Sequence, residues 1–302
     1  MNHREERAEL RGAVYRGDAG SFVGILKREA WPENALQLIG DGLLRVLHAP
    51  TEGIDEAAHR CVTALWDRGW EGDADLAAGL EAALGSGPVP LLRPLPVDLE
   101  ELAGVLEGDP ATGGGRIDLR TGEVWPQPAI EYAEETGDID DDEQRWLWVE
   151  CEGSRAGYRD MELFIAALDD TDQVNQLGIA IGGRGAFRRF KDQLSRWPEL
   201  LERWYAFSED RQRGRARAWL AAEGYAPAPR QPSCDHPVRA LDGLDGPPTR
   251  RTSFYAVMGV RSWSVDRSLH DDDQLRTKGS RFVAAAVPAS GPSSLALRVG
   301  AG

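Results

Sequence analysis

Long apolar runs and paired cysteines are missing from this chain, and each absence argues against a class of protein. No apolar stretch approaches the roughly 18 residues of a membrane-spanning helix. The first ten residues, MNHREERAEL, lack the apolar core of a signal peptide. The three cysteines, Cys61, Cys151 and Cys234, form no CxxC pair, which disfavours a disulfide framework or a zinc ribbon. These features predict a cytoplasmic protein that does not bind a membrane.

Familiar catalytic motifs are also missing. Histidine occurs only at positions 3, 48, 59, 236 and 270, and no two histidines form a close ligand pair such as HExxH. There is no GxSxG elbow and no Walker loop. We therefore expect no cofactor and no metal, and the catalytic residues, if there are any, stay unknown. The absence of a complete catalytic set favours a protein that is not an enzyme.

Lysine is scarce, with three residues among 35 Lys and Arg, and the formal net charge is −15. Arginine is thus the default cation, so an arginine cluster carries less information here than elsewhere. The negative charge keeps a protein soluble and disfavours general nucleic-acid binding. A nucleic acid therefore stays a weaker alternative to an unknown protein partner or a small anionic ligand.

Helical and proline-rich patterns divide the chain into four parts. Residues 1–86 predict a helical domain, with Asp18 as an N-cap and Pro32 in the first turn of a helix. Residues 87–96 are a proline-rich linker, residues 97–225 a second domain, and residues 226–302 a low-order tail with a short strand at SFYAVMGV.

The second domain is predicted to be α+β, with a small antiparallel sheet followed by helices. GRIDLRTGEVWPQP predicts a hairpin, in which Ile117 and Val124 lie on opposite sides of an Arg-Thr-Gly turn. RWLWVECEG predicts a third strand that is buried on both faces. In the helical part, Ser208 is interpreted as the cap of a last helix and Gly224 as its stop.

Several motifs of this domain resemble uncharacterised protein family 0158, a bacterial family without an assigned activity. The motifs are IDLRTGEVW, GYRDMELFI, GRGAFRRFKD and RARAWLAAEGY, in that order. Together they cover about residues 97–225. The resemblance implies a domain but no reaction, and it supplies no catalytic residues.

A glycine turn followed by cations is the main candidate for a binding site. Gly183, Arg184 and Gly185 precede a helix that carries Arg188, Arg189 and Lys191. A helix N-terminus with free N–H groups favours an anion. The helical period places Phe187, Phe190, Leu194 and Trp197 on one face, in the core, and the cations on the surface. Residues 184–217 hold ten Lys and Arg against five Asp and Glu, so this segment is locally basic.

Two interpretations compete with the anion site. The glycines could serve only the turn, while the cations form a solvated face or pair with the acidic segment of residues 131–143, which holds eight carboxylates. That segment resembles half of a calcium loop, but Glu143 and Val149 replace required residues. Alternatively, carboxylates around Glu150–Glu162 could serve a phosphate-handling or metal-dependent enzyme, although no lysine or histidine lies near them.

Overall fold

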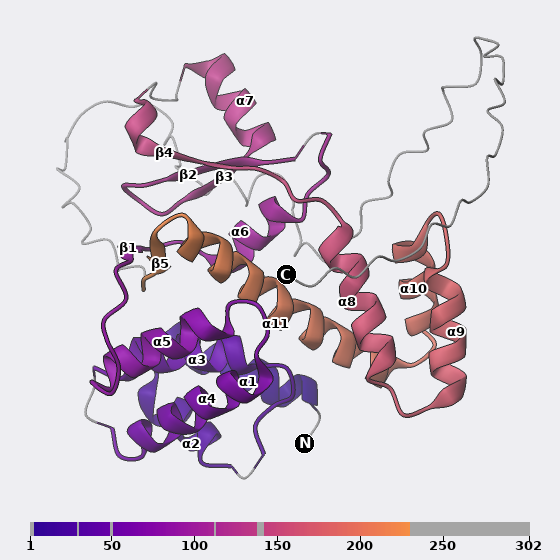
Figure 1. Cartoon of the computed structure of the whole chain (residues 1–302), viewed down its shortest axis with the longest axis horizontal. Coiled ribbons are helices and arrows are strands. Elements are labelled where there is room, and N and C mark those ends of the chain that lie inside the picture. The colour runs from indigo at the N-terminus through magenta and orange to yellow at the C-terminus, as the bar shows by residue number, and fades with distance from the viewer. Residues whose placement is uncertain (1–2, 29, 49–50, 112, 138–141, 230–302) are drawn as a thin grey trace, which may run out of the picture. The chain divides into compact units, whose positions relative to one another are not determined.

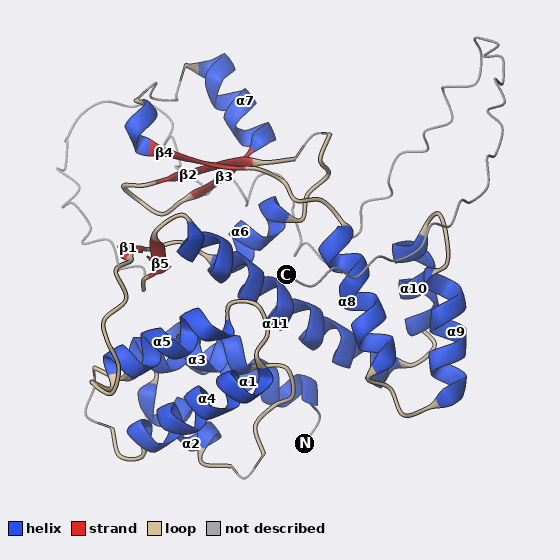
Figure 2. Ribbon diagram, viewed as in Figure 1, coloured by secondary structure: helices blue, strands red, loops and turns tan. Residues whose placement is uncertain are grey.

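Helices and a small antiparallel sheet make up the chain, which confirms the predicted α+β class (Figure 1; Figure 2). The computed structural model describes residues 3–28, 30–48, 51–111, 113–137 and 142–229. All of them belong to the first of two units, residues 1–263 and 264–302. The predicted strand at SFYAVMGV, the tail from residue 230 onward and residues 138–141 of the calcium-like loop lie outside the described residues.

The first five helices pack around a core of their own. They are α1 (His3–Arg16), α2 (Ala19–Leu26), α3 (Leu36–Val46), α4 (Ile54–Arg68) and α5 (Asp73–Ala83). In α3, Ile39 and Leu43 are fully buried, because their spacing of four residues places them on one face. We call α1–α5 the N-terminal bundle.

The beginnings of two helices in the bundle test the sequence interpretation. The Asp18 carboxylate accepts a hydrogen bond from the Ser21 N–H at 3.0 Å, which confirms this N-cap of α2. The prediction for Pro32 was wrong, because α3 begins only at Leu36. Asn34 adopts the left-handed region with φ 52°, and a residue in this region interrupts a right-handed helix.

Three strands form the main sheet in the order β3-β2-β4. They are β2 (Gly115–Asp118), β3 (Val124–Pro126) and β4 (Trp146–Val149), and all neighbours are antiparallel. Ile117 pairs with Val124, which confirms the predicted hairpin. Helix α6 (Leu99–Leu106) lies on one side of the sheet and α7 (Gln127–Thr136) on the other (Figure 1).

Strand β4 is not buried on both faces, so this prediction was wrong. Trp148 is 60% exposed, and the guanidinium of Arg116 lies 3.9 Å from its ring centroid. The reason is the position of β4 at the edge of the sheet. The apolar alternation that suggests a central strand instead presents one aromatic side chain to a cation.

The last four helices build a second helical layer around aromatic side chains. They are α8 (Arg155–Ala166), α9 (Thr171–Ile181), α10 (Ala186–Leu194) and α11 (Pro198–Ala222). Phe190 is 1% exposed and lies edge-to-face on Trp204 at 4.8 Å. Leu194 is fully buried, while Phe187 and Trp197 pack against the same cluster. The structure thus confirms that this aromatic face belongs to the core.

Helix α11 runs through Ser208 without a break, so this residue is not a cap and the prediction was wrong. Glu209 and Asp210 follow it and resemble the acidic first turn of a helix, but they pair with arginines instead. Gly224 has φ 84° just beyond the last turn, and glycine adopts this conformation without strain. It therefore ends α11 as predicted.

Helix α11 contacts both halves of the described chain. A Cβ atom added at Gly214 of α11 would lie closer than 3.0 Å to the Glu71 carbonyl oxygen, between α4 and α5 of the bundle. After α11, β5 (Tyr225–Pro227) pairs in parallel with β1 (Arg93–Leu95), which lies inside the proline-rich segment. The predicted domain limits at residues 86, 96 and 225 stay a prediction.

Candidate anion-binding surface

The arginines in the second half of α11 are occupied by carboxylates. Arg211 and Arg215 both donate to Asp160 of α8, at 2.9 and 2.7 Å. Arg213 pairs with Asp41 of α3 at 3.1 Å and also with Glu100 of α6. Arg211 and Arg213 are half-buried, and Arg215 is buried. They hold α11 to its neighbours and therefore offer no free cationic surface.

The contact between α11 and the N-terminal bundle is mostly polar. Gln37 donates its backbone N–H to Asp210 at 3.0 Å and its side-chain amide to Asp73 at 2.8 Å. Arg68 pairs with both carboxylates. Arg217 donates to the Gln37 side-chain oxygen at 2.9 Å. Because Gln37, Asp73 and Asp210 are at most 1% exposed, each of them depends on these partners.

Burial changes the protonation equilibria of this network. It raises the pKa of Asp210 above its ordinary value, although the Arg68 guanidinium acts in the opposite direction. Burial likewise raises the pKa of Glu107, against the effect of Arg215. For Arg213, burial favours the neutral form, but the carboxylates of Asp41, Glu100 and Glu209 outweigh it, so its pKa is raised. The arginines stay charged throughout.

The candidate residues from the sequence lie at the turn between α9 and α10. Gly183 and Gly185 have φ 82° and 74°, so both occupy the left-handed region that favours glycine. Gly185 is the N-cap residue of α10, and no side chain of the described residues caps this helix. The turn and its glycines are thus explained by backbone geometry, and the first N–H groups of α10 are left for another acceptor.

The cations around this turn differ in what they contact. Arg189 donates to the carbonyl oxygens of Ala180 and Gly182, at 3.0 and 2.5 Å. It therefore closes the end of α9 rather than facing a ligand. Arg188 is 85% exposed, and its one ion pair among the described residues is a loose contact with Asp192 at 3.9 Å. Lys191 is half-buried and has contacts of its own.

Arg184 is the most available cation of the turn. It is exposed, and within the described ranges its side chain makes no hydrogen bond or ion pair. Arg184 and Arg188 are therefore the members of the predicted set that can meet an incoming anion. Gly183, Gly185, Arg189 and Lys191 shape or support the turn.

The acidic segment has partners elsewhere. Glu134 pairs with Arg116 of β2 at 3.2 Å, and Asp142 pairs with Arg120 in the hairpin turn at 2.6 Å. Residues 138–141 lie outside the described residues. The observed pairs thus connect the segment to arginines near the sheet, which the sequence interpretation did not anticipate.

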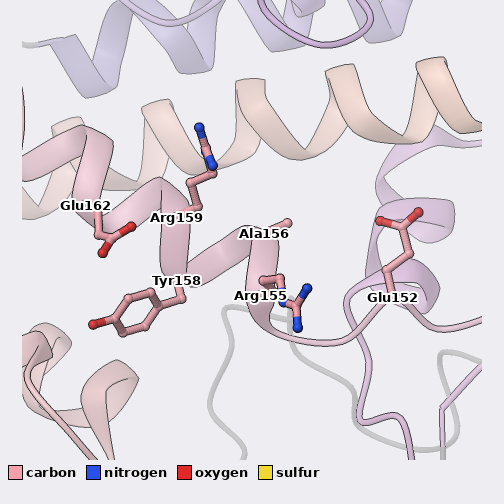
Figure 3. Close-up of a pocket in the computed structure, with 6 residues that line it drawn as sticks. All are labelled: Glu152, Arg155, Ala156, Tyr158, Arg159 and Glu162. Carbon is pink, nitrogen blue, oxygen red and sulfur yellow. The ribbon is translucent and has the colours of Figure 1, made fainter. Parts of the chain in front are cut away.

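The carboxylates around Glu150–Glu162 do not act as one group. Asp160 is 1% exposed and serves the ion pairs with Arg211 and Arg215. Glu152 and Glu162 are exposed and border a hollow of about 370 Å³ along α8 (Figure 3). Arg155 and Arg159 of α8 line the same hollow. Sequence reasoning missed both arginines, although their i,i+4 spacing places them on one helix face.

The described part of the chain holds neither a membrane-spanning helix nor a metal-binding cluster. No helix there is long and apolar enough to cross a membrane. No group of three His, Cys, Asp or Glu side chains there is arranged to hold a metal ion. The two cysteines that the structure describes, Cys61 and Cys151, are free thiols.

Comparison with known proteins relates part of the chain to an uncharacterised family. Residues 127–244 match the model of the Uncharacterised protein family (UPF0158). A UPF0158 protein of Pseudomonas aeruginosa is 28% identical over 148 residues, which cover 46% of this chain and 91% of that protein. No solved structure matches. The resemblance inferred from the motifs is confirmed, with a matched range that begins at residue 127.

Proposed function

We propose that this chain is a non-enzymatic binding or regulatory module. The premise is the match of residues 127–244 to the uncharacterised family UPF0158. The chain binds an anionic ligand or an acidic protein surface through the α9–α10 turn. Arg184 and Arg188 supply the charge, and the uncapped N-terminus of α10 supplies N–H donors. A location in the cytoplasm is part of the proposal, and the free thiols of Cys61 and Cys151 support it.

One observation carries this proposal. The cations of the basic segment, residues 184–217, differ in how far carboxylates engage them. Arg213 and Arg215 on α11 are held by carboxylates of α3, α6 and α8. Arg184 and Arg188 at the turn are exposed and have no close carboxylate partner within the described residues. A chain with a net charge of −15 thus presents a local cationic surface, which attracts an anionic partner through its field.

A thermal-shift titration of the full chain at low salt tests the proposal. The probes are inorganic phosphate, a nucleotide, an oligonucleotide and an acidic peptide. A ligand that binds only the folded state raises stability by about 2.7 kcal/mol at a concentration of 100 times Kd. We expect stabilisation by at least one probe, and we expect it to weaken as salt is added. An oligonucleotide that alone stabilises the chain would favour the nucleic-acid alternative.

The double variant Arg184→Ala, Arg188→Ala should abolish this stabilisation. It should leave the fold intact, because surface substitutions usually change stability by about 0.5 kcal/mol or less. The matched control is Arg45→Ala, since Arg45 is exposed on α3 and makes no ion pair within the described residues. The proposal fails if no probe stabilises the wild-type protein, or if the double variant responds to the probes as the wild type does.

A second candidate function is a phosphate-handling or metal-dependent enzyme. The observation that favours it is the hollow bordered by Glu152 and Glu162. Asp160 forms buried ion pairs with Arg211 and Arg215. This carboxylate is therefore not free to take part in a reaction, which argues against the enzyme. Phosphatase activity with a generic aryl phosphate and Mg²⁺, abolished by Glu162→Gln, would establish this candidate over the first.

A further inference from the structure

Strand β4 lies at the edge of the main sheet, and its outer side has no partner strand among the described residues. Leu119 of β2 donates its N–H to the Arg145 carbonyl oxygen at 2.8 Å. Because residues of an antiparallel pair alternate, Leu147 and Val149 also bond to β2, whereas the N–H and C=O of Trp148 point away from it. Within the described ranges these two groups make no hydrogen bond. The outer side of β4 thus offers a donor and an acceptor to a further strand.

The residues of β4 lack the features that usually protect an edge strand. Natural sheets keep other strands away from their edges with charged residues, proline or a bulge. Trp146–Val149 contains neither a charged residue nor a proline, and its pairing with β2 runs without a bulge. Trp148 is 60% exposed, although the Arg116 guanidinium lies over its ring. An edge of this kind is a template for the addition of a strand.

Two carboxylates follow β4 directly and limit the charge of such a strand. Glu150 and Glu152 are exposed, and within the described ranges their side chains make no ion pair. A strand that runs antiparallel to β4 begins beside the end of β4, so the residues just before it lie near these carboxylates. The added strand should therefore carry cations immediately before its apolar residues.

One segment of this chain has that pattern. SFYAVMGV, residues 253–260, is rich in aromatic and β-branched residues, which favour a strand. Arg250 and Arg251 precede it, and the segment itself contains no Asp, Glu or Pro. Its charge and its composition thus complement those of β4 and of the carboxylates that follow β4.

The connection between β5 and this segment is long enough to reach β4. The described residues end at position 229, and the 23 residues 230–252 precede SFYAVMGV. A fully extended chain of this length spans roughly 75 Å. A domain of the size of the described part has a radius of gyration of only about 17 Å. The length of the connection therefore does not prevent the segment from reaching the edge of the sheet.

We propose that residues 253–260 add to the outer edge of β4 as an antiparallel fourth strand of the main sheet. The backbone of Trp148 bonds to the added strand. With Arg250 beside Glu152, the same register places Phe254 beside Trp148, and aromatic cross-strand pairs stabilise a sheet. This contact uses no residue of the α9–α10 turn and goes beyond the function proposed above, so either can fail while the other holds.

Hydrogen–deuterium exchange of the full chain, followed by mass spectrometry, tests this contact. Strand pairing protects amide groups from exchange. We therefore expect residues 253–260 to exchange at least about tenfold more slowly in the full chain than in a synthetic peptide of residues 249–262. Gel filtration with light scattering at two protein concentrations determines the oligomeric state, and we expect the same protection at both concentrations.

The variant Trp148→Pro removes the outward N–H donor of β4. Proline is tolerated in an edge strand where the N–H faces away from the neighbouring strand, so the pairing of β4 with β2 should remain. Residues 253–260 should then exchange as fast as they do in the peptide. Circular dichroism verifies that the variant keeps its fold.

An exchange of charges tests the same contact without a change in the backbone. Glu150→Lys with Glu152→Lys should speed the exchange of residues 253–260 about threefold or more, because repulsion replaces two surface ion pairs. Adding Arg250→Glu and Arg251→Glu to this variant should restore the protection. This restoration also makes the test independent of whether Trp148→Pro folds.

A matched control reverses two exposed carboxylates of the N-terminal bundle, Glu52→Lys with Asp67→Lys, and should leave the protection unchanged. A loss of protection in this control would trace the effect to net charge and contradict the assignment to β4. The proposal is also overturned if residues 253–260 exchange as fast in the wild type as in the peptide. It is likewise overturned if the protection survives Trp148→Pro or the reversal at Glu150 and Glu152. A dimer whose protection rises with concentration would assign the edge to a second copy instead of the same chain.

Discussion

Replacing Gly214 by alanine should destabilise the protein, although the same change inside a helix usually has the opposite effect. Gly214 lies in the interior of α11, where the helix crosses the loop between α4 and α5. A Cβ atom there would lie closer than 3.0 Å to the backbone carbonyl of Glu71 and 3.7 Å from the Gln37 amide nitrogen. A backbone atom cannot rotate away as the end of a side chain can, so the two segments must separate.

Two opposing contributions determine the size of the effect. Alanine is favoured over glycine in a helix interior by about 1 kcal/mol. Overpacking a close contact costs about 1–3 kcal/mol. Separation would also lengthen the hydrogen bonds of Gln37 to Asp210 and of Arg217 to Gln37, which lie on either side of the contact and are buried. We therefore expect a net loss of roughly 1–2 kcal/mol in the free energy of unfolding.

Urea denaturation of the variant and of a matched control measures this effect. The control is Gly178→Ala in α9, where the added Cβ atom meets nothing within 4 Å. This variant should be more stable than wild type by up to about 1 kcal/mol. Opposite signs for the two substitutions would support the packing of α11 on the bundle. If Gly214→Ala is at least as stable as the wild type, the close contact between α11 and the bundle is wrong.

Three further outcomes follow from the same structure. Phe190→Ala should cost about 3–5 kcal/mol in denaturant unfolding, because its ring is 1% exposed and packs on Trp204; an unchanged midpoint would contradict the aromatic core. Burial raises the pKa of Asp118, but hydrogen bonds from Arg145 and the Arg120 N–H outweigh it and lower the pKa below 3.8. This carboxylate therefore stabilises the fold above its unfolded pKa, and the stabilisation is lost as the pH falls through the folded pKa. Asp118→Asn should reduce the free energy of unfolding at pH 7, and below about pH 4 the stability of the variant should decline less steeply than that of the wild type. Parallel pH profiles of stability for the two proteins would refute this. Within the residues that the structure describes, chymotrypsin should cut first after the fully exposed Leu91. The pieces on either side of this cut should stay together on gel filtration, whereas separation would show that the contacts of α11 do not hold them.

Local patterns were sufficient where a feature depends on neighbouring residues. The alternation around Ile117 and Val124 predicts the hairpin, and the position of Gly224 predicts the end of α11. The helical period of the α10 segment places Phe190 and Leu194 in the core. In each of these cases the spacing of apolar residues or the φ requirement of glycine decides the structure.

Features that depend on residues distant in the chain could not be predicted from local sequence patterns. Ser208, Glu209 and Asp210 have the composition of a helix start, but arginines from α1 and α4 bind the two carboxylates within one long helix. The pairing of β1 with β5 joins short segments in which proline is frequent, and no periodic pattern marks either of them.

The candidate site was predictable in part for the same reason. The glycine turn and the exposure of Arg184 and Arg188 follow from the local sequence. The engagement of Arg189 with the end of α9 depends on the geometry of the turn. The occupation of Arg213 and Arg215 depends on carboxylates more than 100 residues away in the chain. Charge counts along the sequence treat all of these arginines as equivalent.

The pairing of β1 with β5 has a consequence for the order of events during synthesis. Arg93 of β1 contacts Tyr225, which is 132 residues later in the chain, so this part of the fold cannot close until α11 has left the ribosome. The N-terminal bundle has its own core and can form much earlier, since domains generally fold as they emerge. Until α11 arrives, Gln37, Asp41 and Arg68 must stay in water without their later partners. A ribosome stalled shortly before residue 210 would therefore carry a folded bundle with an open polar face.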